Sequence, residues 1–164
     1  MTETIPEKGE TDSAPALLKL KKILVPLDFS TSSEKALRYA VPFAKQFGAR
    51  VVLLHAIEPL PYPTDFTYVP MGEIIPIEPA QKHLADLGRK LVEPALLDST
   101  LVHIGIAFEL IVDFARKLEV DLIVITTHGY TGFKHVLLGS TAERVVRHAP
   151  CPVLVVRECE HDFV

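Results

Sequence analysis

The segment that decides the fold is residues 121–157, DLIVITTHGYTGFKHVLLGSTAERVVRHAPCPVLVVR. Its two apolar runs, 121–127 and 151–157, enclose a glycine-rich loop and a stretch with helical spacing at 140–148. Short, continuous apolar runs are typical of strands covered on both faces of a parallel sheet. A strand, a helix and a second strand in this order predict a crossover unit, since parallel neighbours cannot be joined by a tight turn.

The same alternation extends toward the N-terminus. We expect three further strands and three further helices, the strands at 23–27, 50–56 and 100–105 and the helices at 31–47, 79–97 and 107–120. Five strands alternating with four helices predict an α/β fold, an open, doubly wound, Rossmann-like parallel sheet with helices on both faces. The expected strand order is 3-2-1-4-5.

Local signals set the ends of the first helix. Thr31 and Glu34 have the spacing of a capping box at its start, and Gly48 is a natural stop. Pro42 falls inside this helix and should kink it.

Composition fits one domain, which we place at 20–158. The chain has 164 residues, 48% of them apolar, and a net charge of −4, which argues against a nucleic-acid-binding face. No apolar run approaches the ~18 residues of a membrane span. Residues 1–19 are expected to form a flexible acidic tail without the order of a secretory signal, and 159–164 a C-terminal tail. Two cysteines cannot form a disulfide framework, so we expect a cytoplasmic protein.

The glycine-rich loop predicts a phosphate site. Gly129 and Gly132 would let the backbone approach a ligand closely, and Gly139-Ser140-Thr141 begins a helix whose N–H groups favour an anion. In doubly wound sheets, ligands lie beyond the carboxyl ends of strands where the winding reverses. In the alternative interpretation Ser140, three residues before Glu143, only caps the helix.

The sequence lacks the motifs that are typical of phosphate-loop enzymes, dinucleotide-binding enzymes and hydrolases. The chain lacks Gly-x-x-x-x-Gly-Lys-Ser/Thr, Gly-x-Gly-x-x-Gly after a strand, and Gly-x-Ser-x-Gly. Asp28 has two open interpretations: it accepts from a ribose or adenine or holds Mg²⁺, or it forms a turn into the next helix. His128 adjoins Gly129 and could reach a phosphate, although a lone histidine more often bonds the backbone.

Three segments, KKILVPLDFS (21–30), GARVVLLHAIEP (48–59) and 121–157, together resemble the universal stress protein family. The resemblance extends over 21–157. The nucleotide-binding members of that family carry Gly-x2-Gly-x9-Gly-Ser/Thr, which Gly129, Gly139 and Ser140 match. Thr126 stands where the family's first glycine would be.

The resemblance implies bound ATP, or ADP or AMP, with little turnover, and Asp28 is the candidate to hold Mg²⁺. The implied contacts to base and ribose are Pro26, Asp28 and Ala56. Those to ribose and phosphates are Thr126, Thr127, His128, Gly129, Tyr130, Thr131, Gly132, Gly139, Ser140 and Thr141. Two alternatives stay open: a slow Mg²⁺-dependent ATPase, and an interaction protein without nucleotide, which Thr126 favours.

The last strand predicts self-association. In the expected order 152–157 lies at a sheet edge, and its apolar residues on both faces invite pairing with another chain. The same edge on a second copy gives a two-fold homodimer, which the family resemblance also implies. The long proline-rich connection 57–78 is expected to be functional or mobile.

Overall fold

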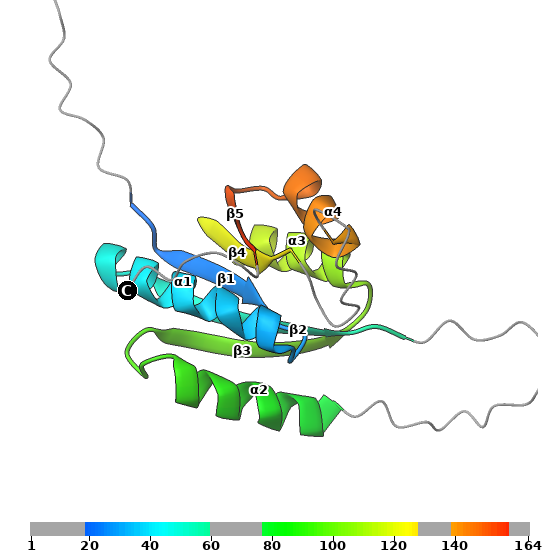
Figure 1. The fold of residues 1–164 in the computed structure, drawn as a ribbon, viewed down its shortest axis with the longest axis horizontal. Coiled ribbons are helices and arrows are strands. Elements are labelled where there is room, and N and C mark those ends of the chain that lie inside the picture. The colour runs from blue at the N-terminus through cyan, green and yellow to red at the C-terminus, as the bar shows by residue number, and fades with distance from the viewer. Residues whose placement is uncertain (1–18, 60–76, 128–138, 158–164) are drawn as a thin grey trace, which may run out of the picture.

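A computed structural model describes residues 19–59, 77–127 and 139–157 of the chain (Figure 1). Its elements in chain order are β1 (Lys22–Pro26), α1 (Thr31–Phe47), β2 (Arg50–Ile57), α2 (Ile77–Leu91), β3 (Leu97–Ile104), α3 (Ala107–Lys117), β4 (Leu122–Thr126), α4 (Ser140–His148) and β5 (Val153–Val156). The two expected tails and most of the connection 57–78 lie outside the described residues.

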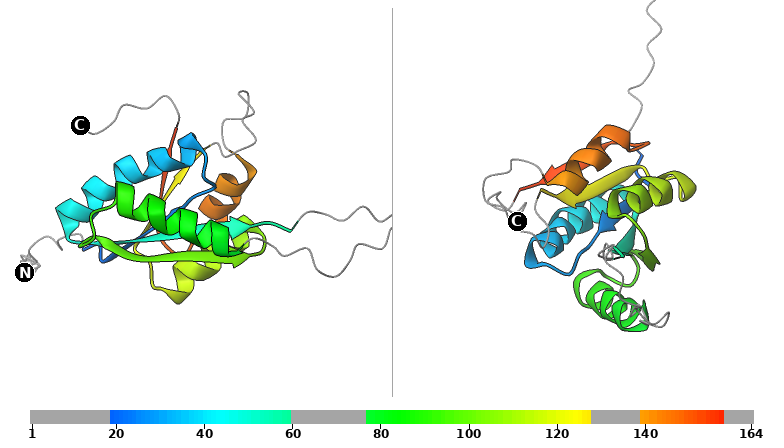
Figure 2. Two further views of the ribbon diagram at one scale, coloured as in Figure 1. Left: turned by 90° about the horizontal axis from the view of Figure 1, so that it is seen from below. Right: turned by 90° about the vertical axis from the view of Figure 1, so that its right-hand side faces the viewer.

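The five strands form one parallel sheet in the order β3-β2-β1-β4-β5, which confirms the predicted fold class and strand order. Helices α1 and α2 cover one face, and α3 and α4 cover the other (Figure 2). The chain winds outward from β1 in one direction to β3 and in the other from β4 to β5. The winding therefore reverses between β1 and β4.

The continuous apolar runs are explained by two separate cores. Along β1, Ile23 and Val25 belong to the core under α1 and α2, whereas Leu24 belongs to the core under α3 and α4. All three are fully buried. A strand sends alternate side chains to opposite faces, so a sheet covered twice requires apolar residues at every position.

The ends of α1 show one correction. Its N-cap is Ser30, whose Oγ accepts from the Ser33 N–H at 3.0 Å, so the predicted cap at Thr31 is wrong by one residue. Gly48 ends the helix with φ +66°, as predicted. Pro42 lies inside α1, and the helix continues past it to Phe47.

Three other boundaries, the end of α2, the start of β3 and the end of α3, differ from the predicted ones. α2 ends at Leu91, not near 97, and Leu97 already begins β3, which is longer than the expected strand at 100–105. Pro94 explains the difference, because proline lacks an N–H and disfavours the helical conformation of the residue before it. α3 likewise ends at Lys117 rather than at residue 120.

Two further features of the sequence are its lack of a long apolar run and the cysteine at position 151. Among the described residues, no helix has the length and apolar character to cross a bilayer. Cys151 is half-buried against the core under α3 and α4. Burial and the nearby Asp121 carboxylate raise the pKa of its thiol, which suits an inert packing role.

A cavity at the carboxyl ends of the central strands

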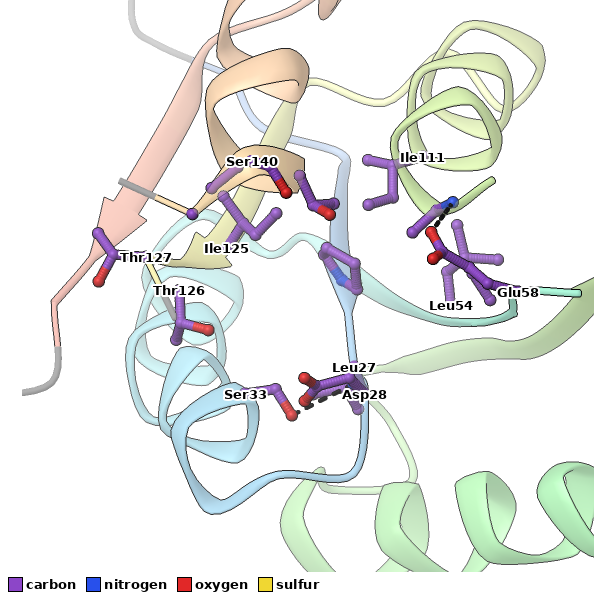
Figure 3. Close-up of a pocket in the computed structure, with 16 residues that line it drawn as sticks. Leu27, Asp28, Ser33, Leu54, Glu58, Ile111, Ile125, Thr126, Thr127 and Ser140 are labelled. Carbon is purple, nitrogen blue, oxygen red and sulfur yellow. Dashed lines mark hydrogen bonds between the residues drawn. The ribbon is translucent and has the colours of Figure 1, made fainter. Parts of the chain in front are cut away.

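A cavity of about 370 Å³ opens where the winding of the sheet reverses. It lies beyond the carboxyl ends of β1, β2 and β4 and between the first turns of α3 and α4 (Figure 3). Volumes of this order are typical of small-molecule sites, and the position is the usual one for ligands in doubly wound sheets. The loop after the first strand thus meets the two described ends of the loop after the fourth strand, Thr127 and Gly139, at one site, as the sequence predicts.

The cavity brings together all the described residues among the predicted contacts. These are Pro26, Asp28, Ala56, Thr126, Thr127, Gly139, Ser140 and Thr141. The other five predicted contacts, His128, Gly129, Tyr130, Thr131 and Gly132, lie outside the described residues. The wall also contains residues that the sequence analysis did not select: Leu27, Ser33, Leu54, Glu58, Ala107, Ile111, Ile125 and Ala142.

The α4 side of the cavity is held by a backbone contact between the two ends of the glycine-rich loop. The Gly139 N–H donates to the Thr127 carbonyl oxygen at 2.7 Å. A Cβ at Gly139 would lie 2.6 Å from that same oxygen, so only glycine fits. Its φ is −63°, so the requirement is close approach and not an unusual backbone conformation. Gly139 thereby fixes where α4 begins.

The N-terminus of α4 faces the cavity without a side-chain cap of its own. Its N-cap residue is Gly139, which has no side chain, and Ser140 is the first helical residue. The alternative in which Ser140 caps the helix is therefore wrong. The first N–H groups of a helix have no partner within it, and together with the helix dipole they favour an anion. Ser140 and Thr141 add hydroxyl groups to this part of the wall.

Asp28 has a structural role in addition to its place in the wall. Its Oδ1 accepts from the Ser30 N–H at 3.0 Å, which is the predicted turn into α1, and from the Ser30 hydroxyl. Its own N–H donates to Ser33 Oγ at 3.3 Å. The structure therefore confirms the turn, while the position of Asp28 in the cavity wall leaves its predicted ligand contact as a proposal.

Glu58 is a polar residue of the wall that the sequence analysis missed. It follows β2 directly, and its Oε1 accepts from the Ala107 N–H at the start of α3 at 2.8 Å. The N-cap residue of α3 is Ile106, which has no polar side chain, so Glu58 supplies the cap from another element. The available signal was position: an acidic residue just past a strand beside the switch point.

The described residues contain no cluster of three or more His, Cys, Asp or Glu side chains that could hold a metal ion. Within the described part of the chain, Asp28 would therefore need oxygens of a ligand and of water to complete a Mg²⁺ site. Mg²⁺ is commonly bound in this way, by one or two carboxylates plus phosphate oxygens and water.

Comparison with known proteins agrees with this fold. Residues 19–157 match the model of the universal stress protein family. The chain belongs to this family. A universal stress protein of Methanocaldococcus jannaschii is 36% identical over 141 residues, covering 84% of this chain and 82% of the relative.

Solved structures of universal stress proteins share the fold. The protein UspA from Lactobacillus plantarum superimposes with a TM-score of 0.67 at 28% identity, covering 85% of this chain and 99% of that one. A universal stress protein from Archaeoglobus fulgidus, solved in complex with dAMP, superimposes with a TM-score of 0.56 at 24% identity, covering 84% and 98%.

Proposed function

We propose that this universal stress protein binds an adenine nucleotide, ATP foremost, and serves as a cytoplasmic stress-response module. The observation that carries the proposal is the start of α4, which has no side-chain cap among the described residues and faces a cavity of about 370 Å³ at the switch point of the sheet. The A. fulgidus protein supports it at the level of the fold, since that protein holds dAMP.

The proposed orientation places the phosphates at the N-terminus of α4. Ser140 and Thr141 would bind them through backbone N–H groups, assisted by the loop residues 128–132. Pro26, Asp28 and Ala56 would lie along the ribose and base. Mg²⁺ would be shared between the phosphates and the Asp28 carboxylate, whose Oδ1 already accepts from Ser30.

We propose binding with little turnover. The chain lacks the phosphate-loop lysine and the other motifs of fast phosphoryl transfer. Backbone N–H groups can hold a phosphate without activating water. Phosphate release from purified protein and Mg-ATP should therefore stay far below one turnover per second, the lower end of typical enzymes.

The test is nucleotide binding by the full chain. Calorimetry should detect ATP, and mass spectrometry should find an adenine nucleotide in extracts of freshly purified protein. Nucleotide-free protein should gain about 2.7 kcal/mol of stability at 100 times the dissociation constant. Absence of binding, together with a melting temperature indifferent to millimolar ATP, would leave the interaction protein as the better interpretation.

We also propose a homodimer through β5. This strand lies at the edge of the sheet, and three of its four apolar residues, Val153, Leu154 and Val155, are only half-buried in one chain. Pairing with the same edge of a second copy would bury them further and would form a closed, two-fold assembly.

A further inference from the structure

Two helices, α3 and α4, begin at the cavity, and their N-termini differ in charge. The start of α4 presents N–H groups, whereas at the start of α3 the Ala107 N–H donates to the carboxylate of Glu58. Both Ala107 and Glu58 line the cavity. One end of the site therefore favours an anion, and the other already holds one.

This difference sets the direction in which a nucleotide lies. Phosphates are attracted to α4 and repelled by the Glu58 carboxylate. Figure 3 shows Glu58 with Leu54 and Ile111 on one side of the cavity and Ser140 on the other. The apolar Leu54 and Ile111 suit a base and not a phosphate. The base consequently lies on the side of Glu58.

Glu58 has one oxygen available for that base. Oε1 is occupied by the Ala107 N–H, and no other described residue donates a hydrogen bond to Glu58. A carboxylate only accepts hydrogen bonds. Oε2 can therefore bind an amino group of the base, and it repels an oxygen or ring nitrogen that presents a lone pair.

We propose that Glu58 is a specificity-determining residue that selects a base carrying an exocyclic amino group. This inference rests on the proposed function and extends it, because Glu58 is not among the residues assigned to the nucleotide above. The contact contributes selectivity through a charge-assisted hydrogen bond. Since the Glu58 side chain is exposed, the expected preference is about tenfold, which corresponds to about 1.4 kcal/mol.

The sharpest variant is Glu58→Gln. The Ala107 N–H needs an acceptor, so it holds the amide oxygen and the cap survives. The amide NH₂ then faces the base in place of Oε2, and it donates where the carboxylate accepted. The fold is kept while the hydrogen-bonding character of the position is reversed. Glu109→Gln is the matched control, because Glu109 is exposed in the first turn of the same helix and does not line the cavity.

The experiment compares the dissociation constants of ATP and purine riboside triphosphate, which lacks the 6-amino group, by calorimetry on the full chain. Wild-type protein and Glu109→Gln should prefer ATP about tenfold, and Glu58→Gln should bind the two nucleotides about equally. A tenfold preference that survives in Glu58→Gln, or equal binding by the wild type, would overturn the role of Glu58 while leaving nucleotide binding intact. Absence of binding of either nucleotide to wild-type protein would instead reject the proposed function.

Discussion

At the scale of single residues, Gly139 shows that a glycine in a phosphate-type loop can be required by the protein and not by the ligand. A glycine at the start of an anion-binding helix is commonly explained by the space that a phosphate needs. The structure places the missing Cβ 2.6 Å from the Thr127 carbonyl oxygen instead. The glycine therefore closes the loop, and any effect on ligand binding follows from the position of α4.

Gly139→Ala should lower both stability and ATP affinity. The methyl group would force Thr127 or the start of α4 to move, at a cost of about 1–3 kcal/mol, as for other overpacked sites. Thermal unfolding and calorimetry measure the two effects. Ser140→Ala is the control, since it keeps the backbone N–H and already has a Cβ, and its stability should stay within about 0.5 kcal/mol of wild type. An unchanged melting temperature in Gly139→Ala would contradict the close contact.

The sequence predicted those site residues that contribute through their backbone groups at the start of a helix. Gly139, Ser140 and Thr141 were found because a glycine followed by small hydroxyl residues at a helix start is a local pattern. Glu58 was not found, because its partner Ala107 is 49 residues away and only the fold brings them together. The hydrogen bond itself has no signature in a single sequence, although the position of Glu58 just past a strand beside the switch point was an available signal.

At the scale of elements, the start of α1 joins the fold to the site. Ser30 caps the helix through Ser33, and Asp28 holds Ser30 in place. Asp28 and Ser33 line the cavity, whereas Ser30 does not. Capping and binding can therefore be separated by comparing substitutions at neighbouring positions.

Ser30→Ala should cost about 1 kcal/mol of stability by loss of the N-cap and leave ATP affinity nearly unchanged. Asp28→Ala should show a similar loss of stability and, in addition, weaker ATP binding, because its carboxylate is proposed to contact the ligand. Chemical denaturation and calorimetry on both variants separate the two roles. Equal ATP affinity in the two variants would make Asp28 a turn residue only.

The existence and order of the elements followed from the sequence, but several ends did not. A short, continuous apolar run such as 122–126 fits a strand in a sheet that is covered on both faces. The N-cap at Ser30 was displaced by one residue from the prediction, since Ser30 and Thr31 are both good caps and only the Asp28 turn selects between them. Near Pro94, the helical spacing of apolar residues alone led to a predicted C-terminal end of α2 that is too late in the sequence.

At the scale of the whole molecule, the outer edge of β5 is the feature that predicts assembly. The carbonyl oxygens of Pro152 and Val156 accept from Ile123 and Thr127 of the β4 side. Backbone groups of successive residues in a strand point to opposite edges, so those of Val153 and Val155 face away from β4. Only alternate N–H groups of the strand are thus available to a second chain.

Val155→Pro should convert a dimer into a monomer that still binds ATP. It removes an outward-facing N–H at the centre of β5 and leaves the carbonyl contacts of Pro152 and Val156 with β4 in place. The cavity is lined by other elements, so nucleotide affinity should persist. Val155→Ala is the matched control, because it shortens the side chain but keeps the N–H. Light scattering at micromolar concentration should give twice the 18.2 kDa of one chain for wild type and Val155→Ala, and 18.2 kDa for Val155→Pro. A wild-type mass of 18.2 kDa would rule out the β5 dimer, and a Val155→Pro dimer would place the interface on another surface.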